Sequence, residues 1–325
     1  MFPKEIKNPI AEELSAFEDL FNSLFKSENP LLKCVFEQIS QSKGKQLRPI
    51  FLLLVAKLCG DVNKKTISSA AIVEMLHTAS LVHDDVIDNT LLRRGKKSIN
   101  AIFNNQIAVL AGDYLLAQVM TLCFEKLGND EQINKCLANL TSELSDGELL
   151  QLYYSNKVEW SEENYFQIIK KKTAILFSTC AKIGAITANA APETIEKLVL
   201  FGEYLGMIFQ IKDDIFDYSP LMDTGKPALN DIKEGKITLP LLYALKTATD
   251  TEKAFVKNII QEKDSQKENL QTLLSIVQKQ KGIELAEEKM REYQQKALEL
   301  LLSFPESEVR QSLLLIINYV SERKK

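Results

Sequence analysis

Three aspartates lie close together in the segment 83–88, which has the sequence His-Asp-Asp-Val-Ile-Asp. The residues before them, 70–82, contain neither Gly nor Pro and repeat apolar side chains every three to four positions, which predicts a helix. At about 100° per residue, Asp84, Asp85 and Asp88 share roughly a quarter turn of its surface. Carboxylates repel one another at this spacing and are disfavoured at a helix C-terminus, so the cluster predicts a cationic ligand. Oxygen ligands suit Mg²⁺, although a solvated acidic helix end is the simpler alternative.

The same D-D-x-x-D pattern occurs a second time, as Asp213, Asp214 and Asp217, again at the end of a long apolar segment. One such pattern arises by chance in about 4% of chains of this length, and two in fewer than roughly one chain in 1,000. Two carboxylate clusters bracketed by Lys and Arg can hold an organic diphosphate through several Mg²⁺ ions. The second copy therefore favours a ligand site over two solvated helix ends.

Basic residues gather in short segments along the same chain. Lys45 and Arg48 stand at the predicted start of a helix, where free N–H groups and the positive dipole end also favour an anion. Arg93 and Arg94 follow the first acidic cluster, and they either neutralise it or bind phosphate oxygens. Further lysines occur in the segments 170–173, 225–227 and 233–236. Taken alone, each segment is more often a basic helix start or a solvated charged face.

The composition restricts the class of protein. The chain has 325 residues, 45% of them hydrophobic and 26% charged, which is enough to bury a large core. Its net charge of -4, without a basic face, argues against nucleic-acid binding. Five scattered cysteines without C-x-x-C spacing indicate reduced thiols in a cytoplasmic protein. No signal pattern opens the sequence and no stretch approaches about 18 uninterrupted apolar residues, so no transmembrane segment is expected.

The elements that must position these residues are predicted to be helices. The chain contains only 12 Gly and 9 Pro, and few segments alternate with a period of two. No linker divides it, so residues 1–325 are predicted to form a single all-α domain, a large helical bundle around a central cavity. The predicted helices cover residues 9–27, 29–40, 47–59, 64–87, 98–109, 111–127, 130–153, 161–190, 194–218, 236–247, 251–262, 265–279, 282–303 and 305–323.

Taken together, these motifs resemble those of the all-trans polyprenyl diphosphate synthases. The match runs in order through GKQLRP, HTASLVHDDVIDNTLLRRGKKS, AGDYLLA, KKTAILF, GMIFQIKDDIFDY and GKPALNDIKEGKITLPLLYAL. The resemblance implies the isoprenoid synthase type of all-α fold and, usually, a homodimer. It also implies head-to-tail condensation of isopentenyl diphosphate with an allylic diphosphate, with release of pyrophosphate.

The resemblance implies roles for individual residues as well. About three Mg²⁺ ions on the allylic diphosphate would be bound by Asp84, Asp85, Asp88 and Asp213, with Asp214 and Asp217 as further ligands through water. The same diphosphate would be contacted by Arg93, Lys172, Thr173, Gln210, Lys226 and Lys236. Isopentenyl diphosphate would be bound by Lys45, Arg48, His77 and Arg94, with Phe209 near its carbon tail. The catalytic residues would be Asp84, Asp85, Asp88, Lys172 and Asp213.

These roles agree with what the reaction demands. Ionisation of an allylic C–O bond creates a carbocation and pyrophosphate, and nearby cations stabilise the charge on that leaving group. Water must be excluded from the site, since it would quench the carbocation as an alcohol. The isopentenyl double bond can then attack the carbocation.

The length of the product is predicted from the helix before the first acidic cluster. An isoprene unit is about 5 Å long, close to the helix pitch of roughly 5.4 Å, so each turn back from Asp84 corresponds to about one unit. Ala79 and Ser80 lie one turn back and are small, and Leu76 forms the next layer. The facing helix offers as candidate stops Met120, Cys123 and Phe124. A product of about C30 to C45, as used for quinone side chains, is favoured, with a geranylgeranyl or farnesyl product as the alternative.

Two rival classes and one departure from the family pattern remain. A class I terpene cyclase would share the first acidic cluster, but it would not need the basic residues assigned to isopentenyl diphosphate. A non-catalytic partner subunit would be expected to lose the acidic motifs, which are intact here. Leu229 stands where the family often has Gly, two residues after Pro227, which leaves the path of that loop open. Residues 251–325 predict packing helices, with weak membrane-surface contact as a further option.

Overall fold

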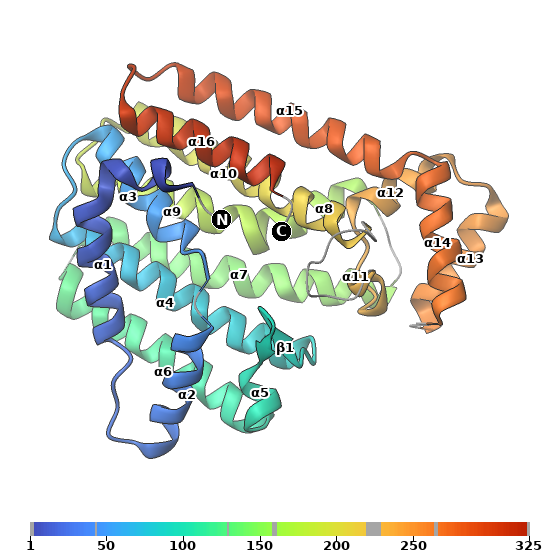
Figure 1. Ribbon diagram of the computed structural model, residues 1–325, viewed down its shortest axis with the longest axis horizontal. Helices are drawn as coiled ribbons and strands as arrows, with labels where there is room; N and C mark the ends of the chain where they lie inside the picture. The colour runs from blue at the N-terminus through green and yellow to red at the C-terminus, as the bar shows by residue number, and fades with distance from the viewer. Residues whose placement is uncertain are drawn as a thin grey trace. The chain divides into compact units, whose positions relative to one another are not determined.

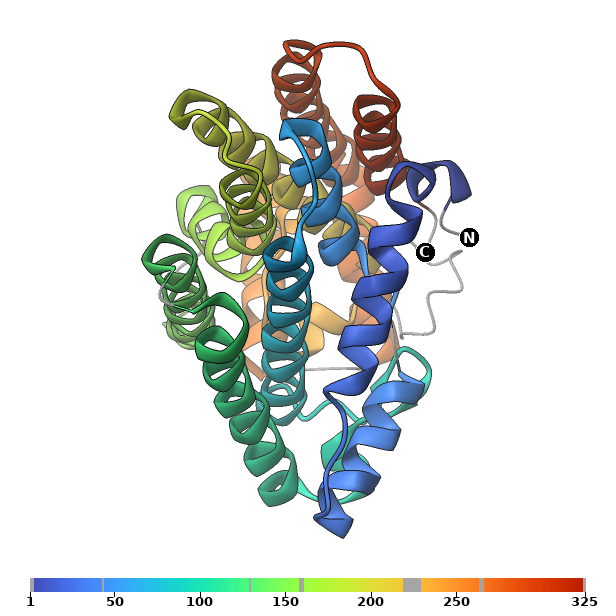
Figure 2. The ribbon, with the colours of Figure 1, turned by 90° about the vertical axis from the view of Figure 1, so that its left-hand side faces the viewer.

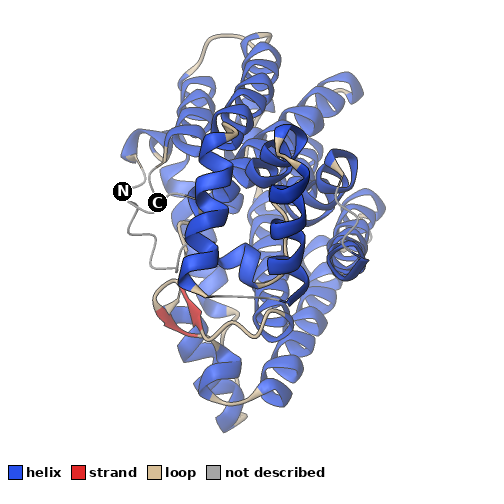
Figure 3. Cartoon of the chain, turned by 90° about the vertical axis from the view of Figure 1, so that its right-hand side faces the viewer, coloured by secondary structure: helices blue, strands red, loops and turns tan. Residues whose placement is uncertain are grey.

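The computed structural model describes residues 3–42, 44–128, 130–157, 161–218, 229–262 and 266–323 (Figure 1). Within these ranges the chain is almost entirely helical, which confirms the predicted all-α fold class. The only strands among the described residues are β1 Leu92–Arg93 and β2 Lys96–Lys97, which pair as one antiparallel hairpin (Figure 3).

The described helices follow one another along the chain in this order. The first half contains η1 Lys4–Ile6, η2 Asn8–Ile10, α1 Ala11–Ser23, α2 Pro30–Gln41, α3 Leu47–Cys59, α4 Lys64–Ile87, α5 Ile99–Ile102, α6 Asn105–Leu122, η3 Cys123–Leu127 and α7 Glu131–Lys157. The second half contains α8 Glu162–Ile169, η4 Lys170–Ala174, α9 Ile175–Thr187, α10 Pro192–Asp217, α11 Asn230–Lys233, α12 Leu239–Thr247, α13 Asp250–Glu262, α14 Lys267–Lys279, α15 Gly282–Leu302 and α16 Glu308–Glu322. The segments η1 and η2 are 3-10 turns, whereas η3 and η4 are π-helical.

Two helices that carry predicted site residues, α3 and α4, begin and end where the sequence predicts. The start of α4 is a capping box. The Asn63 side chain accepts from the Thr66 N–H at 3.1 Å, and the Thr66 hydroxyl oxygen accepts from the Asn63 N–H at 3.2 Å. These contacts satisfy two N–H groups that a helix start leaves without intrahelical partners. The helix ends at Ile87, and the N–H of the next residue, Asp88, still donates to the Asp84 carbonyl at 2.8 Å.

The predicted boundary between helices 98–109 and 111–127 is wrong. The structure has the short α5 first, and α6 then runs through the predicted break without interruption. Asn104 sets the true boundary, because its backbone is extended and its side chain accepts from the Ile107 N–H at 2.9 Å. The predicted helix 161–190 likewise contains the π-helical η4 in place of regular α-helical geometry.

The chain forms two compact units. The first comprises Met1–Thr141, Phe177–Leu200 and Phe304–Leu315, and the second comprises Ser142–Leu176, Phe201–Ser303 and Ile316–Lys325. Each unit has its own buried apolar side chains and carries one of the two acidic motifs. The single-domain organisation stays a prediction.

In the first unit α4 is the central helix. It packs against α1, α3 and α6 (Figure 2), and every side chain from residue 68 to residue 77 is buried. A helix that is covered on all sides buries apolar side chains on more than one face, so the apolar residues of α4 are not confined to one stripe. Gly184 lets α9 approach α3 closely, since a Cβ atom there would lie 2.6 Å from the Leu52 carbonyl oxygen.

In the second unit α12 packs against α8, α14 and α15. Its buried Leu241 and Ala244 belong to an apolar cluster built mainly from α12, α13 and α14. The same cluster includes Tyr218, Leu229 and Ile232, which come from the chain around the end of the second acidic motif. The core of this unit therefore fixes the described residues that follow α10.

The continuous helix formed by α6 and η3 is the one helix in the described ranges whose length and composition would allow it to cross a bilayer. It covers Asn105–Leu127 with a mean hydropathy of 1.7, and 33% of its most apolar window is buried. Core helices of soluble proteins have the same properties, so this is weak evidence for a membrane span. The large apolar side chains that this helix exposes are Val109, Leu110, Met120 and Phe124.

Candidate active site

The first acidic motif lies at the C-terminal end of α4. Asp85 is buried, with 4% of its surface exposed, and the Arg93 guanidinium contacts its Oδ1 atom through Nε at 2.7 Å and through a terminal nitrogen at 2.5 Å. The β1–β2 hairpin brings Arg93 there, because its two-residue turn places Arg94 and Gly95 at positive φ, 54° and 75°. The Asp85 carbonyl also accepts from the Thr90 N–H at 2.9 Å, so the segment that leads into the hairpin is hydrogen-bonded to the helix end.

A pocket of about 70 Å³ in the first unit contains several of the predicted residues, namely His77, Asp85, Arg93 and Arg94. The Arg94 guanidinium donates to the Ser42 carbonyl at 2.8 Å, which fixes its position in the pocket. Burial, with the positive charges of nearby arginines, holds the pKa of His77 well below its usual value. The imidazole is therefore neutral and can donate one N–H to a phosphate oxygen.

Glu74 also lines this pocket, although the sequence did not single it out. Its side chain is buried, and its Oε2 atom has no hydrogen-bond partner among the described residues. Burial raises the pKa of Glu74 to about 7, against the opposing effect of Arg48 and Arg94. The sequence feature that could have indicated Glu74 is its position, since it is a carboxylate about one helical turn before His77 in an otherwise apolar run.

Lys45 and Arg48 lie at the start of α3, as predicted, with Lys45 exposed and Arg48 partly buried. The Arg48 guanidinium carbon lies 5.5 Å from the centre of the Phe177 ring. Its charge lowers the pKa values of both His77 and Glu74. Arg48, on α3, thus acts electrostatically on two side chains that line the first pocket.

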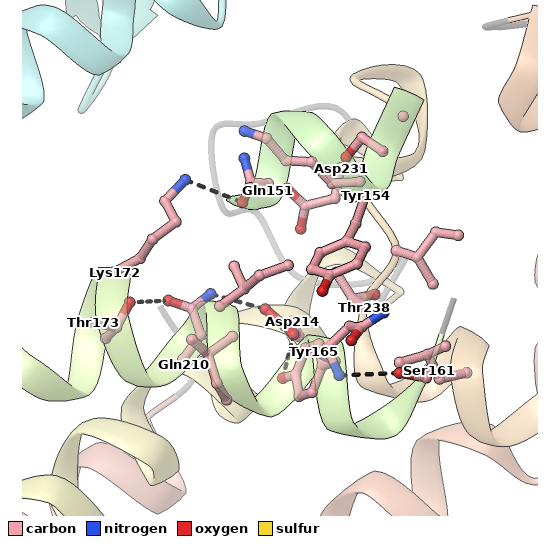
Figure 4. Close-up of a pocket in the computed structure, with 18 residues that line it drawn as sticks. Gln151, Tyr154, Ser161, Tyr165, Lys172, Thr173, Gln210, Asp214, Asp231 and Thr238 are labelled. Atoms are coloured by element: carbon pink, nitrogen blue, oxygen red, sulfur yellow. Dashed lines mark hydrogen bonds between the residues drawn. The ribbon is translucent and has the colours of Figure 1, made fainter. Parts of the chain in front are cut away.

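A cavity of about 180 Å³ lies in the second unit (Figure 4). The predicted residues that line it are Lys172, Thr173, Gln210, Asp214 and Lys236. They come from η4, from α10 and from the segment between α11 and α12, so the packing of this unit alone brings them together. Lys226, predicted to join them, lies outside the described residues.

A chain of hydrogen bonds runs along one wall of this cavity (Figure 4). The Thr173 hydroxyl donates to Gln210 Oε1 at 2.6 Å, and the Gln210 amide donates to Asp214 Oδ1 at 2.8 Å. The Tyr165 hydroxyl donates to the other oxygen of Asp214, Oδ2, at 2.6 Å. Tyr165 was not predicted, because an aromatic residue in an amphipathic helix usually indicates only core packing.

A close approach of η4 to α10 explains how Thr173 reaches Gln210. A Cβ atom at Gly206 would lie 2.5 Å from the Cα atom of Ala174, so only glycine permits this packing. Gly206 and Gln210 are about one turn apart and share a face of α10. The glycine that lets the two segments touch therefore also places Gln210 beside Thr173.

The two described lysines of this cavity have carboxylate partners. The Lys172 ammonium forms an ion pair with Glu148 and donates to Gln151 Oε1 at 3.0 Å. Lys236 forms an ion pair with Glu234 at 2.7 Å. An anionic ligand in the cavity would compete with these carboxylates for the lysines.

The three carboxylates of the second motif have different partners. Asp214 is buried, and this burial, with the nearby charge of Asp231, raises its pKa well above its usual value. Asp213 is more exposed and forms an ion pair with Arg323 at 2.7 Å. Asp217 accepts from the backbone N–H of Asp231 at 3.1 Å through its Oδ2 atom.

Arg323 is a second residue that the sequence did not single out. Besides its ion pair with Asp213, its guanidinium donates to the Phe209 carbonyl at 2.9 Å and lies 4.0 Å from the centre of the Phe209 ring. The basic end of the chain was interpreted only as packing or membrane contact. The structure instead connects it with two of the predicted site residues.

The carboxylate oxygens of both motifs fit a hard divalent cation such as Mg²⁺. In the part of the chain that the structure describes, no three His, Cys, Asp or Glu side chains are gathered as a preformed metal site. Asp85 and Asp213 each contact an arginine guanidinium instead. A metal ion bound at either position would therefore share the carboxylate with that guanidinium or replace it.

The residues predicted to set the product's length lie in the first unit. Leu76 and Ala79 are buried, and the Ser80 hydroxyl donates to a carbonyl of its own helix at 2.9 Å. None of these three residues lines either cavity described above. Met120 and Phe124, named as candidate stops, are 64% and 71% exposed, so they lie on the outer face of the helix formed by α6 and η3.

Known proteins similar to this chain identify its family. The model of the polyprenyl synthetase family matches residues 29–277. The chain belongs to the polyprenyl synthetase family. It is therefore an enzyme, a trans-prenyltransferase, as the sequence motifs predicted.

Three relatives show how far the similarity extends. The all-trans-nonaprenyl-diphosphate synthase (geranyl-diphosphate specific) of Rhodobacter capsulatus is 36% identical over 324 residues, which cover 99% of this chain and 98% of that protein. A polyprenyl synthase from Caulobacter crescentus, crystallised with calcium and isoprenyl diphosphate, superposes with a TM-score of 0.93 at 30% identity, covering 99% of this chain and 98% of that one. A geranylgeranyl pyrophosphate synthase from Bacteroides thetaiotaomicron has a TM-score of 0.85 and 39% identity, covering 98% of both chains.

Proposed function

We propose that the enzyme condenses isopentenyl diphosphate with an allylic diphosphate, head to tail and in the presence of Mg²⁺, and releases pyrophosphate. The observation that carries this proposal is the set of residues that line the two cavities. In each unit, the buried middle aspartate of one acidic motif lines a cavity together with side chains suited to phosphate. The names of the relatives describe enzymes of the same class.

Isopentenyl diphosphate binds, in this proposal, in the pocket of the first unit. Arg94 lines the pocket and Arg48 reaches it electrostatically, so both favour a diphosphate. The neutral imidazole of His77 donates an N–H without adding a charge that burial would disfavour. Lys45, at the exposed start of α3, is the remaining cation assigned to this substrate.

The allylic diphosphate binds in the cavity of the second unit, where its proposed contacts are Lys172, Thr173, Gln210 and Lys236. Mg²⁺ bound by the aspartates of the acidic motifs would stabilise the charge that develops on the leaving diphosphate. Lys172 exchanges its contact with Glu148 for a phosphate oxygen. Ile168 and Ile169 line the same cavity and help to exclude the water that would quench the carbocation.

For the product we propose an all-trans chain of about C30 to C45. The small side chains of Ala79 and Ser80 leave α4 without a bulky residue about one isoprene unit from Asp84. The Rhodobacter capsulatus relative is named for a nonaprenyl product, which supports this range. The Bacteroides thetaiotaomicron relative is named for a geranylgeranyl product, so a C20 product is the alternative.

A second copy of this chain is the proposed partner. The side chains of Leu110, Met120 and Phe124 are 67%, 64% and 71% exposed on the helix formed by α6 and η3. Apolar side chains gathered on one exposed face indicate an interface, and most soluble homo-oligomers are symmetric dimers. Light scattering should give the mass of a dimer, and Leu110→Glu should shift it toward the monomer.

The reaction can be tested by measuring pyrophosphate release from isopentenyl diphosphate with dimethylallyl, geranyl, farnesyl or geranylgeranyl diphosphate. We expect release that requires an allylic primer and Mg²⁺ and that EDTA abolishes. Asp84→Ala should lower kcat by at least about 100-fold while the far-ultraviolet circular dichroism stays unchanged. Release that is independent of primer, or that survives the substitution, would contradict the proposal. A cyclised hydrocarbon formed from the allylic substrate alone would indicate a terpene cyclase.

A further inference from the structure

Tyr165 is a buried tyrosine whose hydroxyl points at the wall of the second cavity (Figure 4). It lies in the short helix α8, which Ser161 caps by accepting from the Asn164 N–H at 3.0 Å. The Tyr165 hydroxyl donates to Asp214 Oδ2 at 2.6 Å, a short O–H···O hydrogen bond. Its ring packs edge-on against Phe166, with 5.2 Å between the ring centres. The ring therefore packs in the core, and the hydroxyl forms a hydrogen bond with Asp214.

Both oxygens of Asp214 accept a hydrogen bond from within the second unit. Oδ2 accepts from Tyr165, and Oδ1 accepts from the Gln210 amide at 2.8 Å. Only 2% of Asp214 is exposed. These contacts suit a residue that orients its neighbours, whereas Asp213 in the same motif is 41% exposed at its side chain.

The orientation of the Gln210 amide follows from its contact with Asp214. Because the Gln210 NH2 group donates to Asp214, the carbonyl oxygen of the same amide faces the other side. That oxygen accepts from the Thr173 hydroxyl at 2.6 Å. The second N–H of the amide is then available in the cavity. The Thr173 hydroxyl can rotate about its Cβ–Oγ bond toward a ligand without moving its backbone.

We propose that Tyr165 is a positioning residue for the allylic diphosphate: its hydroxyl fixes Asp214, which orients Gln210 and, through it, Thr173. The inference rests on the proposed function, because it assumes that Gln210 and Thr173 bind that diphosphate. It assigns to Asp214 a role through Gln210, which differs from the water-mediated metal ligand that the family resemblance implies. The proposal assigns Tyr165 an effect through Asp214 and no substrate contact of its own.

Tyr165→Phe removes the hydroxyl and keeps the ring that packs in the core. With isopentenyl diphosphate at saturation and geranyl diphosphate varied, we expect the KM for geranyl diphosphate to rise about tenfold. The KM for isopentenyl diphosphate should stay within about twofold of the unsubstituted enzyme, because that substrate is assigned to the other pocket. A change confined to one substrate is not what a general loss of stability produces.

Tyr243→Phe is the matched control. Tyr243 also donates to a carboxylate in the second unit, Glu162 Oε1 at 2.9 Å, but it does not line the cavity. Its substitution removes a hydrogen bond of the same kind and should leave both KM values unchanged. The melting temperatures of the two variants show whether each has lost a similar amount of stability.

A double-substitution cycle tests the connection between Tyr165 and Asp214. If Tyr165 acts through Asp214, adding Tyr165→Phe to Asp214→Asn should raise the KM for geranyl diphosphate by less than about twofold. Equal KM values for Tyr165→Phe and Tyr243→Phe would overturn the inference, as would a uniform loss in kcat and both KM values. Failure of the unsubstituted enzyme to condense the two substrates would instead contradict the proposed function, so the two failures are distinguishable.

Discussion

The two copies of D-D-x-x-D differ most at their middle aspartate. Asp85 and Asp214 are both buried, with 4% and 2% of their surfaces exposed. Asp85 contacts the guanidinium of Arg93, which is a permanent cation. Asp214 accepts hydrogen bonds from two uncharged groups, the Tyr165 hydroxyl and the Gln210 amide. The middle aspartates of the two D-D-x-x-D motifs therefore lie in different electrostatic environments.

The comparison shows that partners from outside a motif decide how its carboxylate behaves. The guanidinium beside Asp85 compensates a buried negative charge. No such cation contacts Asp214 in the described hydrogen-bond network, and burial raises the pKa of its carboxyl well above the usual value. In the first copy, the guanidinium of Arg93 stabilises the negative charge of Asp85. In the second copy, two uncharged donors fix the orientation of Asp214.

Breaking the ion pair of the first copy should have the largest effect on stability. Asp85→Asn leaves the Arg93 guanidinium beside a neutral amide, and removing one partner of a buried pair costs about 3 to 5 kcal/mol. The side chain of Arg93 is 29% exposed, so we expect a value near the lower end, about 3 kcal/mol. Urea denaturation measures the difference. The Arg93→Gln variant is the control, and the double variant should cost less than the sum of the two. An Asp85→Asn variant as stable as the unsubstituted enzyme would break the comparison.

Glu74 adds a third buried carboxyl to the comparison. Its pKa rises from 4.5 to about 7 in the folded chain, so the folded state binds this proton more tightly than the unfolded state. Its contribution to stability therefore falls as pH rises from about 4.5 to about 7, by up to about 3 kcal/mol. Glu74→Gln removes this titration. Between about pH 5 and about pH 8 the variant should gain up to about 3 kcal/mol on the unsubstituted enzyme in urea denaturation. A difference that does not change with pH would show that Glu74 does not titrate in this range.

The smallest loss of stability is expected at Asp214. Asp214→Asn keeps a carbonyl oxygen for the Tyr165 hydroxyl, and Gln210 can turn its amide over to accept from the new NH2 group. We expect a cost of about 1 kcal/mol in urea denaturation, together with a higher KM for the allylic substrate because the Gln210 amide is reversed. A cost as large as that of Asp85→Asn would show that the two middle aspartates are equivalent after all.

Local signals in the sequence were sufficient for much of the fold. The bounds of α3 and α4 were predicted from apolar periodicity and the scarcity of Gly and Pro, and the structure has the same bounds. The break at Asn104 was missed, because an asparagine within an apolar run is a weak sign of a helix start. The π-helical segment η4 was missed as well, since no residue pattern distinguishes it from an α-helix.

The motifs of the candidate site were predictable from the sequence, but the side chains that contact those motifs were not. The acidic clusters and their basic neighbours are visible as short patterns, and several of those residues do line the two cavities. Tyr165 and Asp214 are 49 residues apart, and Arg323 approaches Asp213 from the far end of the chain. Only tertiary packing brings such residues together, so no spacing rule could have indicated them.

The most direct test of the central claim is mass spectrometry of the product made from isopentenyl diphosphate and geranyl diphosphate in the presence of Mg²⁺. An elongating prenyltransferase with small residues at Ala79 and Ser80 should give an all-trans polyprenyl diphosphate of about C30 to C45. A product that stops at about C20 would keep the chemistry and contradict the proposed length, which would direct attention to Leu76. Recovery of unextended geranyl diphosphate from folded enzyme would contradict the account.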